Sequence, residues 1–125
     1  MLDAGALLAI ENGKLTDVLM QAHLSNLPVR LSGGALAQAW RGGPRSARLG
    51  ALLKKDLVTV YALDALEARH VGELIARIGW KRRAKPDVVD AHTALLARMT
   101  RSLVYTSDAG DLARYGVPEA MIRSV

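Results

Sequence analysis

Residues 87–108 read DVVDAHTALLARMTRSLVYTSD and contain the strongest indication of the fold. Apolar residues occur almost all round the segment from Asp87 to Met99, which predicts a helix that is buried on most of its surface. The segment Leu103–Thr106 that follows is rich in residues that favour strands. A buried helix that leads into a strand is typical of an α/β protein.

The alternation of helix and strand continues towards both ends of the chain. Strands are predicted at Leu2 and at residues 29–31, 58–61, 103–106 and 121–125. Helices are predicted at residues 6–11, 15–24, 32–40, 44–53, 64–78, 87–99 and 108–115. No tight hairpin signal separates two strands, so we expect one domain over residues 1–125, with a parallel sheet covered by helices on both faces.

The composition bears on both the core and the compartment. Phe is absent, so we expect a core of Leu, Val, Ile and Ala. Its larger members are expected to be Trp40, Trp80, Met20 and Met99. Cys is also absent, which excludes disulfides and thiolate metal sites and is compatible with a reducing compartment. No apolar run approaches a membrane span, so we expect a soluble cytoplasmic protein with no membrane partner.

The chain is basic, with 17 Lys and Arg residues against 12 Asp and Glu and a formal net charge of +5. Such a surface attracts polyanions such as RNA, or an acidic segment of a partner. The densest run of cations is Lys81, Arg82, Arg83 and Lys85. Two further cations, Arg41 and Arg45, lie near another predicted helix start. We expect this group to contact RNA phosphates; the alternative for any one member is a solvated surface loop.

Three aspartates stand at boundaries between predicted elements. Asp3 follows the first strand end, Asp90 lies in the first turn of the buried helix, and Asp108 follows the strand 103–106. The carboxyl ends of parallel strands converge at one edge of a sheet, so we expect these side chains to meet there. Clustered carboxylates are hard ligands suited to Mg²⁺ or Mn²⁺. Helix capping is the alternative for Asp3 and Asp108, and it is compatible with a site.

Asp87 and Asp90 lie three residues apart and therefore share one helix face. Capping explains Asp87 well. It explains Asp90 less well, because a carboxylate among apolar neighbours is costly unless it is paired or bound to a metal. We therefore assign a site role to Asp90 and a supporting role to Asp87. Asp111 is also assigned a supporting role, as the partner of Asp108 in a cap pair.

The order of these motifs resembles the PIN-domain ribonucleases, especially the VapC-type toxins of bacterial toxin–antitoxin modules. The resemblance rests on Leu2–Leu7 (LDAGAL), Leu36–Gly43 (LAQAWRGG), Asp87–His92 (DVVDAH) and Thr106–Asp108 (TSD), and spans nearly the whole chain. It implies a three-layer α/β/α sandwich with a central, mainly parallel sheet. It also implies an endoribonuclease that depends on Mg²⁺ or Mn²⁺, a cognate antitoxin that blocks the site, and a homodimer.

By this resemblance Asp3 and Asp90 are the chief metal ligands. Asp108, together with Thr106, completes the pocket and holds a second metal ion or a water molecule. One or two metal ions would lower the pKa of a bound water and neutralise the phosphate charge. In-line hydrolysis of an RNA phosphodiester would then leave 5′-phosphate and 3′-hydroxyl ends.

One position departs from the family. Its usual glutamate in the helix after the second strand corresponds to Gln38, which carries no charge. Glu11 is a candidate to compensate, yet it follows Asp3 by eight residues, roughly 12 Å along a continuous helix. A surface or ion-paired role for Glu11 is the alternative. Gln38 also leaves open a second function, a catalytically impaired PIN-fold module that binds RNA or a partner without cutting.

Overall fold

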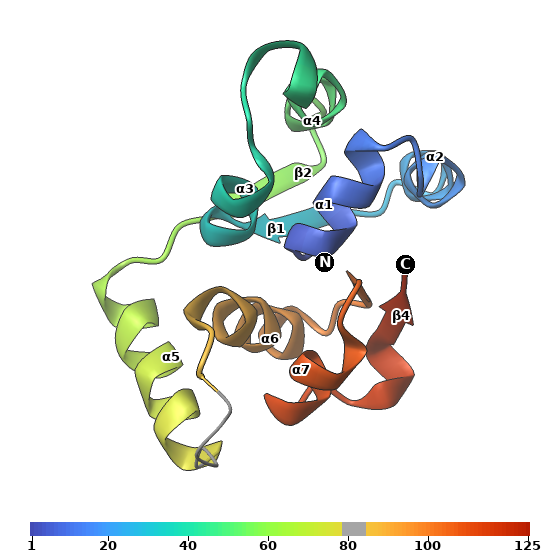
Figure 1. The fold of residues 1–125 in the computed structure, drawn as a ribbon. Coiled ribbons are helices and arrows are strands. Elements are labelled where there is room, and N and C mark those ends of the chain that lie inside the picture. The colour runs from blue at the N-terminus through green and yellow to red at the C-terminus, as the bar shows by residue number, and fades with distance from the viewer. Residues whose placement is uncertain (79–84) are drawn as a thin grey trace.

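The computed structural model describes residues 1–78 and 85–125 (Figure 1). Its α-helices are α1 (Ala4–Glu11), α2 (Thr16–Leu24), α3 (Gly33–Ala39), α4 (Ala47–Leu53), α5 (Ala65–Ile78), α6 (Val88–Thr100) and α7 (Ala109–Arg114). Its strands are β1 (Val29–Ser32), β2 (Val58–Tyr61), β3 (Val104–Thr106) and β4 (Ile122–Ser124). Two 3₁₀-helices are η1 (Gly43–Ser46) and η2 (Glu119–Met121). Within these ranges, no helix has the length and apolar character needed to cross a membrane.

The predicted order of helices and strands is confirmed, and local capping explains where helices begin. α1 starts at Ala4, earlier than predicted, because the carboxylate of Asp3 accepts a hydrogen bond from the backbone N of Ala6 at 2.7 Å. Ser32 caps α3, with its hydroxyl accepting a hydrogen bond from the backbone N of Ala35 at 3.1 Å. Both caps satisfy backbone donors that would otherwise lack a partner.

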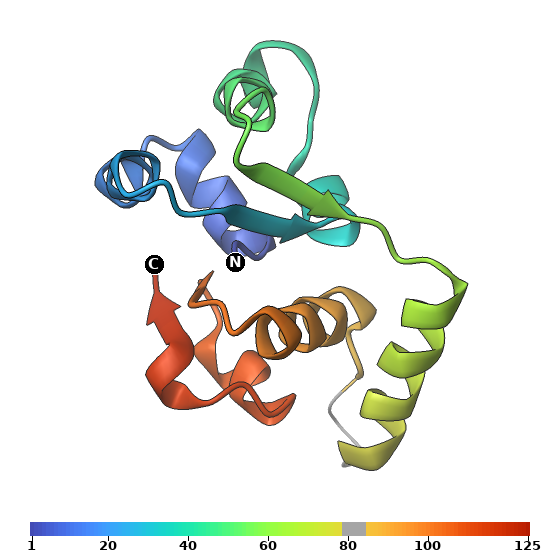
Figure 2. The same cartoon turned by 180° about the vertical axis from the view of Figure 1, so that it is seen from behind.

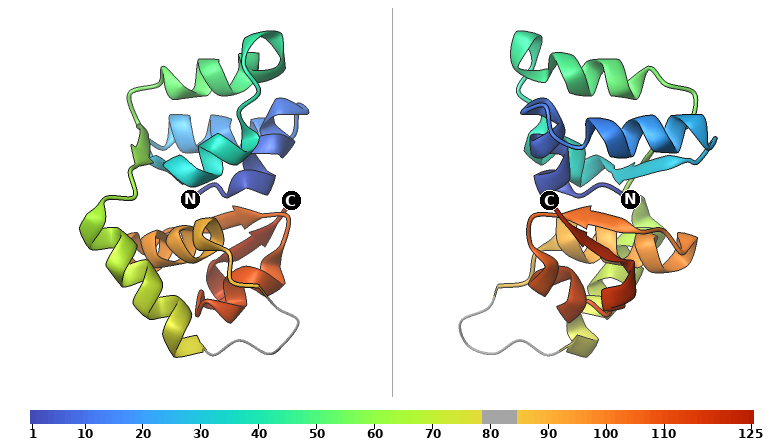
Figure 3. Two further views of the ribbon diagram at one scale, coloured as in Figure 1. Left: turned by 60° about the vertical axis from the view of Figure 1, so that its left-hand side comes forward. Right: turned by 90° about the vertical axis from the view of Figure 1, so that its right-hand side faces the viewer.

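The strands run parallel in two pairs, β1 with β2 (Figure 2) and β3 with β4 (Figure 3). Leu2 links the pairs, since it forms one parallel bridge to Leu31 of β1 and another to Tyr105 of β3. The order across the molecule is therefore β2, β1, Leu2, β3 and β4. This confirms the prediction of an α/β fold with parallel strands, in which the first strand is reduced to a single residue.

The elements form two groups on either side of the N-terminal residues (Figures 1 and 3). One group contains α1 to α4 with β1 and β2, and the other contains α5 to α7 with β3 and β4. Each group has its own cluster of buried apolar residues. α6 connects the groups, because it contacts β1 and α3 as well as α5 and α7.

α6 is the most buried helix of the described chain, as predicted. Its buried residues are Ala91, His92, Thr93, Ala94, Leu96 and Ala97. The ring of His92 is 2% exposed, and its Nε2 lies 2.5 Å from Oε2 of Glu67 in α5. This contact gives a buried polar ring a partner and joins α5 to α6.

The prediction of the larger core residues was wrong wherever it can be compared. Trp40, Met20 and Met99 are 41%, 52% and 64% exposed, and Trp80 lies outside the described residues. Met20 belongs to α2, which has no fully buried residue, and Met99 lies in the last turn of α6. The largest buried side chain in the described part of the chain is instead Tyr115, which is 2% exposed and follows α7.

Candidate functional site

Asp3 is a buried carboxylate at the start of α1, 6% exposed. Its Oδ1 accepts the hydrogen bond from Ala6, and its carboxylate also accepts one from the hydroxyl of Thr106. Burial raises the pKa of Asp3, these hydrogen bonds partly oppose the rise, and the nearby charge of Asp108 adds to it. Asp3 therefore offers carboxylate oxygens in a fixed position, next to Leu2, which bridges to β1 and β3.

Thr106, at the end of β3, connects Asp3 to Asp108. Its side chain is fully buried, and its Oγ1 accepts a hydrogen bond from the backbone N of Asp108 at 2.8 Å. Asp108 caps α7, with Oδ1 accepting a hydrogen bond from the backbone N of Asp111 at 3.2 Å. Asp111 pairs with Arg114 at 3.5 Å. One buried hydroxyl therefore sets the position of Asp3 relative to Asp108.

Asp87 and Asp90 occupy the start of α6. Asp87 is the N-cap, since its Oδ1 accepts hydrogen bonds from the backbone N of Val89 at 2.8 Å and of Asp90 at 3.1 Å. Its predicted capping role is confirmed. Asp90 is half-buried, and within the described residues no hydrogen bond or ion pair ends on its carboxylate. The two neighbouring acids thus differ: one is satisfied by backbone amides and the other has no donor.

The remaining aspartates of the site act on Asp90 through their charge. Burial is the largest cause that raises the pKa of Asp90, and four carboxylates raise it further, to about 6. In order of effect these are Asp87, Asp111, Asp3 and Asp108. The structure therefore brings the three predicted ligands, from the starts of α1, α6 and α7, into the range of one another's charge.

The chemistry of these carboxylates fits a divalent cation, although their present arrangement is not a complete set of ligands. Across residues 1–78 and 85–125, no three histidine or carboxylate side chains are arranged so that they could hold a metal ion as they stand. Among the described residues, Asp90 nevertheless has no hydrogen-bond donor, and its neighbours repel it. A bound cation would relieve that repulsion, and oxygen donors of this kind suit Mg²⁺ or Mn²⁺.

The side chains of Gln38 and Glu11 have different surroundings from those of the three aspartates. Gln38 lies in α3 with its side chain exposed, and in the described chain no hydrogen bond connects it to an aspartate. The carboxylate of Glu11 accepts hydrogen bonds from the backbone N of Arg48 at 3.4 Å and of Leu49 at 3.1 Å. Glu11 therefore stabilises the start of α4, which is a structural role.

The predicted phosphate contacts are only partly described. Arg41, Arg45 and Lys85 are exposed, whereas Lys81, Arg82 and Arg83 lie outside the described residues. The loop with Arg41 and Arg45, between α3 and α4, lies at the opposite end of the molecule from α7 (Figures 1 and 3). A phosphate held at the aspartates is therefore better matched by Lys85, which precedes Asp87 by two residues.

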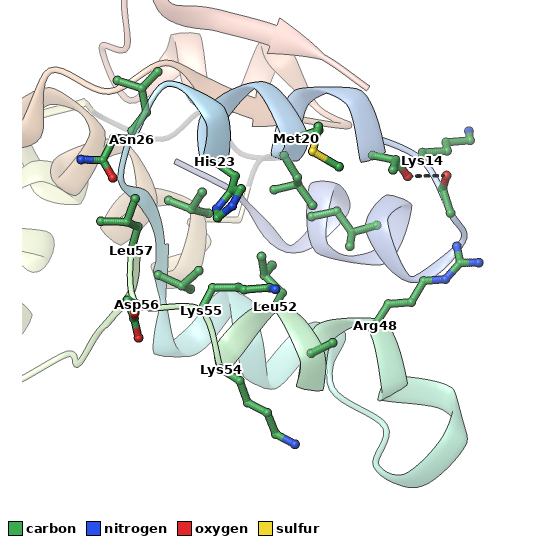
Figure 4. A pocket seen from close by; sticks show the side chains of 18 residues that line it. Lys14, Met20, His23, Asn26, Arg48, Leu52, Lys54, Lys55, Asp56 and Leu57 are labelled. Atoms are coloured by element: carbon green, nitrogen blue, oxygen red, sulfur yellow. Dashed lines mark hydrogen bonds between the residues drawn. The ribbon is translucent and has the colours of Figure 1, made fainter.

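Sequence reasoning missed a hollow of about 980 Å³ among α1, α2, α4, β1 and β2 (Figure 4). Apolar side chains from all these elements line it, among them Leu19, Met20, Leu52 and Val58. Cations also line it, namely Lys14, Arg48, Lys54 and Lys55. Asp56 is the one acid among the described residues of this lining. We call this surface the basic hollow; it shares no residue with the aspartate site.

The site is thus defined by its own geometry. Asp3, Asp90 and Asp108 lie at the starts of three helices. Thr106 contacts the first and the third of them, and the three negative charges repel one another. No protein-family model matches the chain, and neither a curated protein nor a solved structure matches it.

Proposed function

We propose that the protein is an endoribonuclease dependent on Mg²⁺ or Mn²⁺, with a PIN-like three-layer sandwich, and that it acts as the toxin of a toxin–antitoxin module. The observation that supports this most is the surroundings of Asp90, where four further carboxylates oppose its ionisation. Gathering carboxylates does not stabilise a fold, and perturbed groups of this kind cluster at functional sites. The chain as a whole has a net charge of +5 even with this acidic site included, and this supports RNA as the substrate.

Each aspartate has a distinct role in this proposal. Asp3, Asp90 and Asp108 would hold the divalent cation, and Thr106 keeps the first and third of them in place. The cation, when bound, supplies a water of lowered pKa and neutralises phosphate charge. Asp87 holds the first turn of α6 in position through two backbone amides. Hydrolysis would leave RNA fragments with 5′-phosphate and 3′-hydroxyl ends.

The direct test is incubation of purified protein with total cellular RNA in Mg²⁺, Mn²⁺ or EDTA. We expect fragments with 5′-phosphate ends in either metal and none in EDTA, because the carboxylates alone offer no activated water. Asp3→Asn protein, purified in the same way, is expected to be inactive and so reports any contaminating nuclease. Asp17→Asn, at an exposed position of α2, is expected to cleave like the wild type. Equal cleavage by Asp3→Asn, or fragments in EDTA, would contradict the proposal.

The basic hollow supports an inhibitory partner of defined chemistry. An apolar lining with four cations and one acid favours a helical segment that has an apolar face flanked by acidic side chains. Met20 and Leu27 line the hollow and are 52% and 55% exposed, so such a segment would cover apolar surface that now faces water. We propose that the cognate antitoxin binds the toxin through this surface.

The partner to test is the product of a small reading frame adjacent to that of the toxin. Met20→Glu is expected to weaken its binding at least about tenfold, because a charge would replace an apolar contact beneath the segment. Met99→Glu is the matched control, since Met99 is also exposed, at 64% against 52% for Met20, but lies on α6. Isothermal titration of both variants measures the effect. Equal weakening by the two substitutions would exclude the basic hollow as the binding surface.

The proposal also includes a homodimer. Val60, Leu63 and Leu66 are 42%, 42% and 55% exposed along the end of β2 and the start of α5. β2 is the outer strand of its pair, and no strand of the described chain pairs with its other edge, so this edge and these side chains present surface that a second copy would cover.

The alternative, a module that binds RNA or a partner without cutting, is favoured by Gln38 alone. This uncharged side chain is exposed and contributes no carboxylate to the site. In the cleavage experiment the alternative predicts RNA binding that weakens with salt and no fragments in any metal. Intact binding without cleavage would therefore favour it over the nuclease.

A further inference from the structure

The hydroxyl of Tyr115 holds the backbone of Asp87 at two points. It accepts a hydrogen bond from the backbone N of Asp87 at 2.9 Å and donates one to the backbone O of the same residue at 3.2 Å. The ring is 2% exposed and belongs to the apolar cluster that includes Val71 and Leu74. Packing therefore fixes the ring, and the ring in turn fixes the hydroxyl.

The two residues joined in this way stand at the ends of elements that carry the aspartates. Asp87 caps α6, and the first turn of α6 contains Asp90. Tyr115 ends α7, a helix of six residues that begins at its cap, Asp108. A short helix therefore separates Asp108 from the hydroxyl that holds the start of α6.

We infer that Tyr115 is a positioning residue, whose hydroxyl fixes the start of α6 against α7 and thereby sets the separation of Asp90 from Asp108. The two hydrogen bonds are independent of the proposed function, whereas their consequence for metal binding rests on it. Without the hydroxyl, the ring still fills its place in the core, but the backbone of Asp87 loses both contacts. The first turn of α6 then becomes free to open locally.

Tyr115→Phe tests the geometry, with Tyr105→Phe as its matched control. Tyr105 lies in β3, and no hydrogen bond reaches its hydroxyl in the described chain. Amide hydrogen exchange over residues 85–92, measured without metal or RNA, is expected to be about fivefold faster in Tyr115→Phe. It is expected to be unchanged in Tyr105→Phe. Unchanged exchange in Tyr115→Phe would overturn the inference.

Titration with Mn²⁺ tests the consequence. Tyr115→Phe is expected to bind Mn²⁺ about five- to tenfold more weakly, with a cleavage rate at saturating Mn²⁺ close to that of the wild type. A merely structural tyrosine would lower stability and leave the Mn²⁺ affinity of the folded protein unchanged, and that result would overturn the inference. A third outcome is faster exchange in Tyr115→Phe while the wild type neither binds Mn²⁺ nor cuts RNA. That result would support the positioning role and refute the proposed nuclease.

Discussion

Asp90→Asn is expected to abolish metal-dependent RNA cleavage while making the metal-free protein more stable. Cleavage should fall by about 10³-fold or more, because the substitution removes a carboxylate that accepts no hydrogen bond from residues 1–78 and 85–125 and is available to a cation. The first turn of α6 should persist, since its cap is Asp87 and not Asp90. Initial rates of cleavage in Mg²⁺ measure the first effect.

The gain in stability follows from the burial of the Asp90 charge and from the repulsion around it. An amide at this position is not repelled by the neighbouring carboxylates, and it loses no hydrogen bond made by the described residues. The change of the Asp90 pKa from 3.8 to about 6 would correspond to roughly 3 kcal/mol if converted in full. Solvent screens this half-exposed group, so we expect a gain of about 1 kcal/mol at pH 7.5. Urea unfolding in EDTA measures it.

The pH dependence of stability provides a second, separate test of Asp90. Because the folded pKa of Asp90 is raised, the folded state binds more protons than the unfolded state between about pH 4 and pH 6. The free energy of unfolding should therefore fall as the pH rises through this window and remain lower above it. Asp90→Asn should flatten this fall, and the remaining slope should come from Asp3, whose pKa is raised in the same direction.

Asp17→Asn provides the control for each of these effects, because Asp17 is exposed on α2. It should change neither the cleavage rate nor the slope of stability against pH. A protein that loses cleavage and stability together on Asp90→Asn would indicate that Asp90 supports the fold, and the site assignment would then be wrong.

The sequence was sufficient to predict the order of elements because the signals for it are local. Asp3, Ser32 and Asp87 each precede a helix, and each accepts backbone hydrogen bonds in the structure as a cap should. The same local reasoning placed Tyr115 at the end of a short helix and did not foresee its contact with Asp87. That contact joins residues 28 positions apart, and no periodicity within one element encodes it.

Residues outside the aspartates were harder to predict, because their roles depend on packing between elements. Glu11 was considered as a ligand because it could replace the charge that Gln38 lacks, whereas its carboxylate accepts hydrogen bonds from backbone amides at the start of α4. Leu66 is an apolar residue of the predicted helix 64–78, yet it is 55% exposed. The basic hollow had one signal in the sequence, the apolar residues Met20 and Leu27, which line it and are exposed in the structure. Periodicity shows that a face is apolar but not what covers it.

Thr106→Val is expected to damage both the fold and the catalysis, whereas Thr106→Ser should damage mainly the fold. Valine matches the shape of threonine but lacks the hydroxyl that accepts from Asp108 and donates to Asp3. Thr106 and Asp3 are both buried, so loss of the hydrogen bond between them, together with the part-buried one from the backbone N of Asp108, should cost about 2 kcal/mol. Serine keeps the hydroxyl and loses one methyl group, at a cost of about 1 kcal/mol.

The cleavage rates of the two variants should differ more than their free energies of unfolding do. With valine, Asp3 and Asp108 are no longer joined through one oxygen, and cleavage should fall about 10- to 100-fold. The hydrogen bond from Thr106 also lowers the pKa of Asp3, so its loss should raise that pKa further. The acidic limb of the pH–rate profile should therefore move to higher pH in Thr106→Val and stay in place in Thr106→Ser. Profiles that coincide for the two variants would mean that Thr106 acts through packing alone.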